Sequence, residues 1–265
     1  MGVIEHERGA LGVDTRGAYG GATPILFLHG VGSDKSVWAP QLAHFGRNRR
    51  SLALDYPGYG ESQLRADATR DDFAVAVIEA MDALEVERAH ICGLSLGGVI
   101  AIAMHHLAPA RCASLILADS FAVHPDGEAI CARSIDASHA MPMRELAKSR
   151  ASLLLGATAS GAVRAQVIAT MAEIDPHAYR LGAAAVWLAD QRDRAAAISV
   201  PTLVLVGDED RITPPALSEQ LAALIPGAAL TLISGAGHLA NLEQPAAFNR
   251  AVDRFLSGPA ATAEG

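Results

Sequence analysis

The pentapeptide Gly93–Gly97, Gly-Leu-Ser-Leu-Gly, constrains the fold of this chain more than any other feature. It matches the pattern G-x-S-x-G, follows the apolar run Ala89–Cys92 and precedes the helix-like stretch Gly98–Ala103. A serine in this context sits on a sharp turn, and the flanking glycines let neighbouring backbones pass close by. The pattern therefore predicts a strand, a tight turn that presents Ser95 Oγ, and a helix.

An acidic residue and a histidine follow Ser95 in the order serine, acid, histidine that accompanies such a turn. Asp210 comes shortly after the strand-like run Thr202–Val206, and His238 comes shortly after the strand-like run Leu230–Ile233. These side chains are the parts of a nucleophilic triad. The serine attacks, the histidine moves its proton, and the acid orients the histidine.

The chain resembles the α/β-hydrolases over nearly its whole length. Besides the serine turn, four motifs carry the resemblance, namely His29-Gly30, Asp55–Ser62, the turn at Asp210 and the loop from His238 to Glu243-Gln244-Pro245. The resemblance implies that Ser95 is the nucleophile, His238 the general base and Asp210 the acid. Asp208 competes for the role of the acid, but the family's spacing before the Thr-Pro pair matches Asp210. We interpret Asp208 as a turn residue.

An oxyanion hole should accompany the triad, because backbone N–H groups stabilise the charge that develops when the serine attacks. By resemblance to the family, the two donors are the N–H groups of Val31, in the loop after His29-Gly30, and of Leu96, which follows the nucleophile. His29 is then expected to support this loop.

Other side chains are candidates for contacting a substrate. Trp38 and Trp187 are candidates for lining an apolar pocket. Arg133, Arg144 and Arg150 either bind a substrate carboxylate through their planar guanidinium groups or belong to solvated helix faces.

Short strand-like runs alternate with helical stretches, which predicts an α/β fold with a mostly parallel central sheet flanked by helices. The predicted strands are 25–29, 51–55, 89–93, 114–118, 202–206 and 230–233. The predicted helices are 71–84, 96–107, 143–155, 163–171, 177–188 and 245–256. No strand pattern occurs between about residues 121 and 197. We therefore expect a hydrolase core at 1–120 and 198–258, an inserted helical cap at 121–197 and a disordered tail at 259–265.

The composition narrows the class of protein. A chain of 265 residues, 51% of them hydrophobic, is long enough for one large core. Its net charge of -8, without a basic run, argues against a nucleic-acid partner. No apolar run approaches the roughly 20 residues of a membrane span, and the N-terminus lacks the apolar segment of a signal peptide. Three cysteines without a CxxC pair argue against a disulfide framework, so we expect a cytoplasmic protein.

The expected partner is a small-molecule ester or lactone. The serine mechanism needs no cofactor, and the pair His105-His106 lacks an acidic partner at metal-ligand spacing, so we expect neither a cofactor nor a metal. The apolar segment Ala183–Leu188 fits the pocket, the core or a homo-oligomer contact equally well, and the oligomeric state stays open.

Three segments, 90–98, 201–204 and 238–249, are similar to those of 3-oxoadipate enol-lactonases, which hydrolyse an acidic lactone in aromatic catabolism. The loop His29–Gly32 departs from the serine-asparagine-serine type segment usual in those lactonases, so the substrate itself stays open. The constellation favours a serine hydrolase that cleaves an ester or lactone, as a lactonase or carboxylesterase. The alternatives are a C–C bond hydrolase of a ring-cleavage dienoate, with the same triad and fold, and a hydrolase-fold ligand-binding protein.

Overall fold

One mixed sheet organises the molecule. The computed structural model describes residues 2–4, 9–18, 20–65 and 67–258, and the tail expected at 259–265 lies outside the described residues. Within them, eight strands form a sheet in the order β1-β2-β4-β3-β5-β6-β7-β8. The strands are β1 (Gly2–Ile4), β2 (Leu11–Arg16), β3 (Ala22–Leu28), β4 (Arg49–Leu54), β5 (Ala89–Leu94), β6 (Cys112–Ala118), β7 (Thr202–Gly207) and β8 (Ala229–Ile233).

The strand pairing confirms the predicted fold class. All six predicted strands are present, as β3 to β8, and they pair in parallel. Strands β1 and β2, which were not predicted from the sequence, add an antiparallel edge next to β4. Every residue of β5, β6 and β7 is buried, because helices cover both faces of the sheet. The sequences of such strands are continuous apolar runs and do not alternate between apolar and polar residues.

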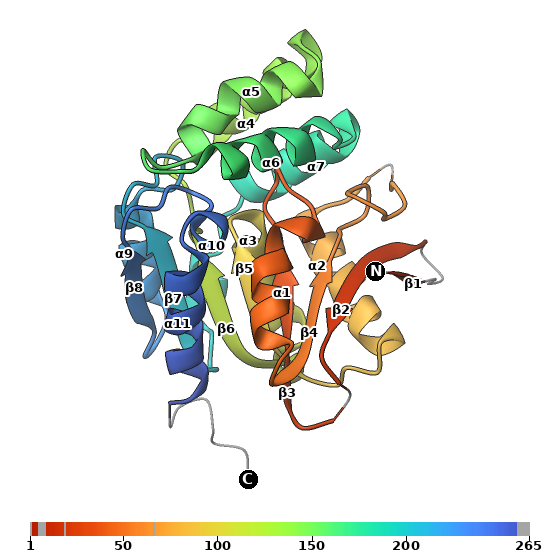
Figure 1. The fold of residues 1–265 in the computed structure, drawn as a ribbon, viewed down its shortest axis with the longest axis vertical. Helices are drawn as coiled ribbons and strands as arrows, with labels where there is room; N and C mark the ends of the chain where they lie inside the picture. The colour runs from red at the N-terminus through yellow and green to blue at the C-terminus, as the bar shows by residue number, and fades with distance from the viewer. Residues whose placement is uncertain (1, 5–8, 19, 66, 259–265) are drawn as a thin grey trace.

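Helices form a layer on each face of the sheet. Helices α1 (Ala39–Phe45) and α11 (Pro245–Leu256) lie on the face toward the viewer in Figure 1, and α2 (Arg70–Ala83) and α3 (Leu96–Leu107) lie behind it. The front layer encloses a core around Phe27, Phe45 and Phe248. The core behind the sheet includes Leu217 and Leu221 of α9 (Pro215–Leu224).

An all-helical segment connects β6 to β7. It contains α4 (Gly127–Ala140), α5 (Met143–Leu154), α6 (Gly161–Ala172), α7 (Pro176–Trp187) and the short α8 (Arg192–Ala196). The helices predicted at 143–155, 163–171 and 177–188 correspond to α5, α6 and α7, whereas α4 was not predicted. Figure 1 shows α4 to α7 gathered above one end of the sheet. The loops that follow β5, β7 and β8 lie beneath them, so this layer covers the place where Ser95, Asp210 and His238 meet.

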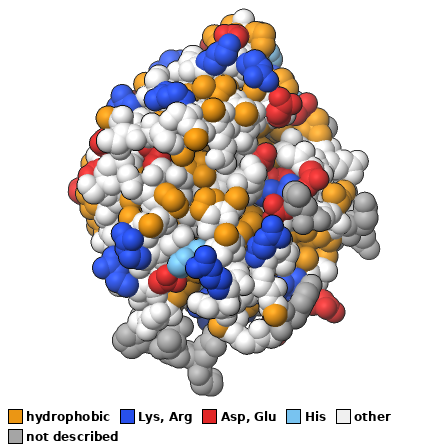
Figure 2. Space-filling model, in the orientation of Figure 1, with side chains coloured by type: hydrophobic (Ala, Val, Ile, Leu, Met, Phe, Trp, Pro, Cys, Tyr) orange, Lys and Arg blue, Asp and Glu red, His pale blue; other side chains and the backbone are white. Residues whose placement is uncertain are grey.

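The surface shown in Figure 2 carries basic and acidic side chains interspersed with apolar ones. This face therefore presents no extended region of a single charge. No helix in the described part of the chain is long and apolar enough to cross a membrane.

Candidate active site

Ser95 occupies a strained turn between β5 and α3. Its φ and ψ of 55° and -113° lie in a region that non-glycine residues rarely adopt. The neighbouring glycines make this geometry feasible: a Cβ added to Gly93 would lie 2.1 Å from the carbonyl oxygen of Gly97, and one added to Gly97 would lie 2.1 Å from that of Leu28. Such strain persists only where the surroundings hold it, and it is concentrated at functional sites.

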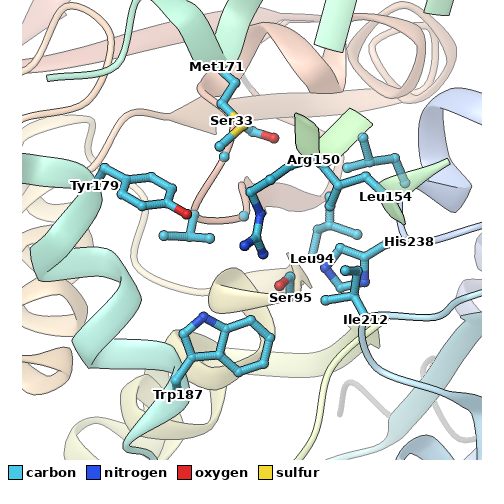
Figure 3. Close-up of a pocket in the computed structure, with 14 residues that line it drawn as sticks. Ser33, Leu94, Ser95, Arg150, Leu154, Met171, Tyr179, Trp187, Ile212 and His238 are labelled. Carbon is cyan, nitrogen blue, oxygen red and sulfur yellow. The ribbon is translucent and has the colours of Figure 1, made fainter. Parts of the chain in front are cut away.

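Hydrogen bonds on both sides fix the turn. The backbone N–H of Ser95 donates to the carbonyl of Ala118 at the end of β6, at 2.8 Å. The Ser120 hydroxyl donates to the carbonyl of Ser95, at 2.9 Å. The Ser95 hydroxyl is left to point into the cavity above the sheet (Figure 3).

Asp210 and His238 form a buried pair in the loops after β7 and β8. The distance from His238 Nδ1 to Asp210 Oδ2 is 2.8 Å, and both side chains are almost fully buried. Asp210 also accepts hydrogen bonds from the Thr213 hydroxyl at 2.7 Å and from the backbone N–H groups of Ile212 and Thr213 at 2.8 and 3.0 Å. A carboxylate with this many donors is held in one orientation.

Electrostatics keeps Asp210 ionised. Burial alone would raise the pKa of Asp210, but the electrostatic attraction to His238 and the hydrogen bonds from His238 and Thr213 outweigh burial and hold the pKa below its ordinary value. An ionised carboxylate beside Nδ1 favours the tautomer with its proton on Nδ1. Nε2 of His238 is then free to accept a proton.

Ser95 and His238 line the same cavity. Figure 3 shows the Ser95 hydroxyl beside the imidazole of His238, with apolar Leu154 and Ile212 near the ring. The cavity has a volume of about 30 Å³, whereas pockets that hold small-molecule ligands usually have roughly 300 Å³ or more. Side chains above Ser95 must therefore move before a lactone can enter.

The two expected oxyanion donors lie on either side of this cavity. Leu96 follows Ser95 at the first position of α3, and Val31 lines the cavity in the loop after β3. Neither backbone N–H has a hydrogen-bond acceptor among the residues that the structure describes. Unpaired N–H groups at these positions fit donors kept for a substrate oxygen.

His29 has a place in this loop but no contact with the cavity. It is fully buried, its Nδ1 lies 2.8 Å from the carbonyl oxygen of Gly30, and the N–H of Tyr56 donates to its Nε2 at 3.4 Å. Burial lowers the pKa of His29, which keeps the ring neutral. These contacts fit a support for the oxyanion loop.

The two tryptophans differ in position. Trp187 lines the cavity and stacks on Phe121, with ring centroids 5.7 Å apart. Trp38 does not line it: its side chain is fully buried and packs on Phe27 at 4.9 Å and Phe248 at 6.0 Å. The expectation of a substrate contact is thus wrong for Trp38, because η1 (Lys35–Trp38) turns the indole into the core beneath α1 and α11.

Glu243 has a structural role that was not predicted from the sequence. Its carboxylate accepts hydrogen bonds from the backbone N–H groups of Gly156, Gly237 and Leu239 at 2.7, 3.0 and 3.3 Å. Burial raises the pKa of Glu243, although these hydrogen bonds oppose the shift. Glu243 thereby ties the His238 loop to the segment that follows α5. Its only signal in the sequence is its place in the motif after His238.

Arg150, Met171 and Tyr179, from three helices above the sheet, also line the cavity. Of these, only Arg150 was a candidate from the sequence, as one of three arginines. Across the described residues, no group of three or more His, Cys, Asp or Glu side chains is placed to hold a metal ion. The three cysteines are buried and free.

Comparison with known proteins gives a consistent family. A family model described as "Alpha/beta hydrolase family" matches residues 25–251. The chain is 28% identical over 237 residues to 3-oxoadipate enol-lactonase 1 of Acinetobacter baylyi, covering 89% of each chain. It is 29% identical to a 2-hydroxy-6-oxononadienedioate/2-hydroxy-6-oxononatrienedioate hydrolase of Cupriavidus pinatubonensis, covering 89% of this chain and 87% of that protein.

Among solved structures, the chain is similar to the enol-lactonase of Burkholderia xenovorans LB400. The TM-score is 0.90 and the sequence identity 28%, with 97% of this chain and all of that chain covered. The likeness therefore includes the helices above the sheet as well as the sheet itself.

Proposed function

Because the chain belongs to the alpha/beta hydrolase family, we propose that it is a serine hydrolase that cleaves a carboxylic ester or lactone through an acyl-enzyme. The observation that carries this proposal is the strained Ser95 turn beside His238, whose other ring nitrogen is bonded to an ionised Asp210. We assign residues 1–120 and 198–258 to the hydrolase core and 121–197 to the cap that roofs the site.

In the proposed reaction, Ser95 Oγ attacks the carbonyl carbon while His238 Nε2 takes its proton. The oxyanion accepts hydrogen bonds from the N–H groups of Val31 and Leu96, and Asp210 stabilises the imidazolium. His238 then gives the proton to the leaving oxygen, which leaves an ester on Ser95. A water molecule, deprotonated by His238, attacks this ester, and the carboxylic acid is released with Ser95 restored.

The finer proposal is a lactonase of the 3-oxoadipate enol-lactone type, and with it a place in aromatic catabolism. Its support is the similarity to the Acinetobacter and Burkholderia enol-lactonases. A C–C bond hydrolase of a ring-cleavage dienoate is the second candidate, favoured by the similarity to the Cupriavidus hydrolase. A ligand-binding protein with the same fold is the third, and slow single turnover with persistent binding would distinguish it.

The test compares wild type with Ser95→Ala on 4-nitrophenyl butyrate and on a lactone panel that includes 3-oxoadipate enol-lactone. We expect kcat to fall on the order of a millionfold in Ser95→Ala, with one lactone turned over faster than the simple ester by wild type. Equal activity of the two proteins would contradict the role of Ser95. Turnover of ring-cleavage dienoates alone would favour the C–C hydrolase.

A further inference from the structure

Among the described residues that line the candidate active site, Arg150 carries the one permanently charged side chain, which enters from above. Arg150 lies near the end of α5, and Figure 3 shows its guanidinium pointing toward Ser95. No Asp or Glu is among the described residues that line the cavity. The side chains around it are largely apolar, including Leu154, Met171 and Trp187.

Within the described part of the chain, Arg150 has no polar partner. Its side chain makes no hydrogen bond or ion pair with any residue that the structure describes. Arg144, on the same helix, differs: its side chain is 60% exposed and faces Glu173, 3.6 Å away. The two arginines are six positions apart, so they leave α5 in different directions. Arg144 is therefore an ordinary surface residue, whereas Arg150 places a cation near the nucleophile that no described residue pairs.

The Arg150 side chain is partly buried beside the apolar side chains of the cavity, and no carboxylate among the described lining residues offsets its charge. A carboxylate on the substrate would supply the missing anion. A guanidinium presents a planar set of N–H donors that matches a carboxylate in a bidentate arrangement. The Tyr179 hydroxyl, which Figure 3 also shows pointing into the cavity, supplies a second donor on the same side.

We propose that Arg150 is a specificity-determining residue, which selects esters or lactones that carry a free carboxylate close to the bond that is cleaved. The proposal rests on the proposed function, since it assumes that Ser95 attacks this substrate. It deepens that function by naming the substrate class: an acidic acyl compound whose carboxylate binds Arg150 while its carbonyl carbon faces Ser95.

The test uses two esters with the same leaving group, 4-nitrophenyl pentanoate and the 4-nitrophenyl monoester of glutaric acid. They differ only in a terminal methyl group that is replaced by a carboxylate. We expect wild type to prefer the acidic ester. Arg150→Ala should lose kcat/KM for that ester on the order of 10- to 100-fold, the worth of a charged hydrogen-bonded pair, while the neutral ester changes little. Arg150→Lys should retain part of the preference, because it keeps the charge and loses the planar geometry.

Arg144→Ala is the matched control, since it removes an arginine from the same helix outside the cavity. It should leave kcat/KM unchanged for both esters. Suppose that activity depends on Ser95, but Arg150→Ala lowers kcat/KM equally for both esters or changes kcat/KM for neither. The role proposed for Arg150 is then wrong, and the proposed function stands. If Ser95→Ala keeps full activity, the proposed function fails. In that case calorimetric binding of glutarate decides the Arg150 inference: binding to wild type and not to Arg150→Ala supports it, and no difference overturns it.

Discussion

Replacing Asp210 with asparagine should abolish most activity by reversing one hydrogen bond. Asp210 Oδ1 accepts from the N–H groups of Ile212 at 2.8 Å and Thr213 at 3.0 Å, so this position must keep an oxygen. The amide nitrogen then takes the place of Oδ2 and faces His238 Nδ1, 2.8 Å away in wild type. Because an amide N–H donates, Nδ1 must accept. The histidine proton moves to Nε2, where it prevents proton transfer from Ser95.

The expected loss in kcat is about 10⁴-fold, which the same exchange causes in another serine triad, and it corresponds to about 5.5 kcal/mol of activation free energy. The fold should survive, because the Thr213 hydroxyl, which donates to Oδ2 at 2.7 Å, can rotate and accept instead. The assay is kcat on 4-nitrophenyl butyrate, with circular dichroism as the check on folding.

The control is Asp208→Asn. Asp208 is exposed, and its carboxylate accepts a hydrogen bond at the turn, from the N–H of Gly235 at 2.8 Å. This variant should keep the kcat of wild type. A folded Asp210→Asn protein that retains about a tenth of wild-type kcat would refute the tautomer argument. A loss confined to Asp208→Asn would transfer the role of the acid to Asp208.

Three further perturbations test the turn, a buried acid and the core. Gly97→Ala should inactivate the protein and lower its unfolding free energy by about 3 kcal/mol or more, because the new Cβ would lie 2.1 Å from the Leu28 carbonyl oxygen. A urea unfolding curve of this variant that matches the curve of wild type would contradict this prediction. Burial and the neighbouring Asp210 raise the pKa of Asp119. Above pH about 4 the folded state therefore keeps a proton on Asp119 that the unfolded state loses. Because the folded state binds more protons, the unfolding free energy falls as pH rises. Asp119→Asn should remove this pH dependence. Parallel curves of unfolding free energy against pH for wild type and Asp119→Asn would contradict the prediction. Trp38→Ala should lower the unfolding free energy by about 3 to 5 kcal/mol and leave KM unchanged. A large rise in KM would instead indicate that Trp38 contacts the substrate.

The sequence predicts the parallel part of the sheet well because local and tertiary preferences agree there. Strands β5, β6 and β7 are buried on both faces, so each is a continuous apolar run that stands out from its neighbours. The positions of Asp210 and His238 follow from the same fact. Parallel strands end at one edge of the sheet, and residues that follow them are brought together there.

Three of the elements that were not predicted, β1, β2 and α4, have weak signals in the sequence. Strand β1 has three residues and β2 has six, and β2 includes the polar Asp14 and Thr15 at its outer end. Helix α4 has few buried positions on a mostly exposed surface, so its apolar periodicity is faint. These segments acquire their structure from the strands or helices beside them.

Side-chain direction is what the sequence could not supply. Trp38 and Trp187 are the same residue type near the same site, yet one is fixed in the core by Phe27 and Phe248 and the other lines the cavity. Arg144 and Arg150 differ in the same way along one helix. In each pair the outcome depends on where an element lies against its neighbours, which pattern alone does not determine.

The contacts of α5 limit how a substrate can reach Ser95. The carbonyl of Leu154, the last residue of α5, accepts the N–H of His238 at 2.7 Å, and Glu243 joins the residues just beyond it to the same loop. Moving the end of α5 would therefore displace the general base. The cavity must instead enlarge through side chains that can change rotamer, and the flexible Met171 and the long Arg150 are suited to this. If Arg150 binds a substrate carboxylate as proposed, we expect the accompanying movement of this side chain to widen the path to the nucleophile, which would join substrate selection to substrate entry.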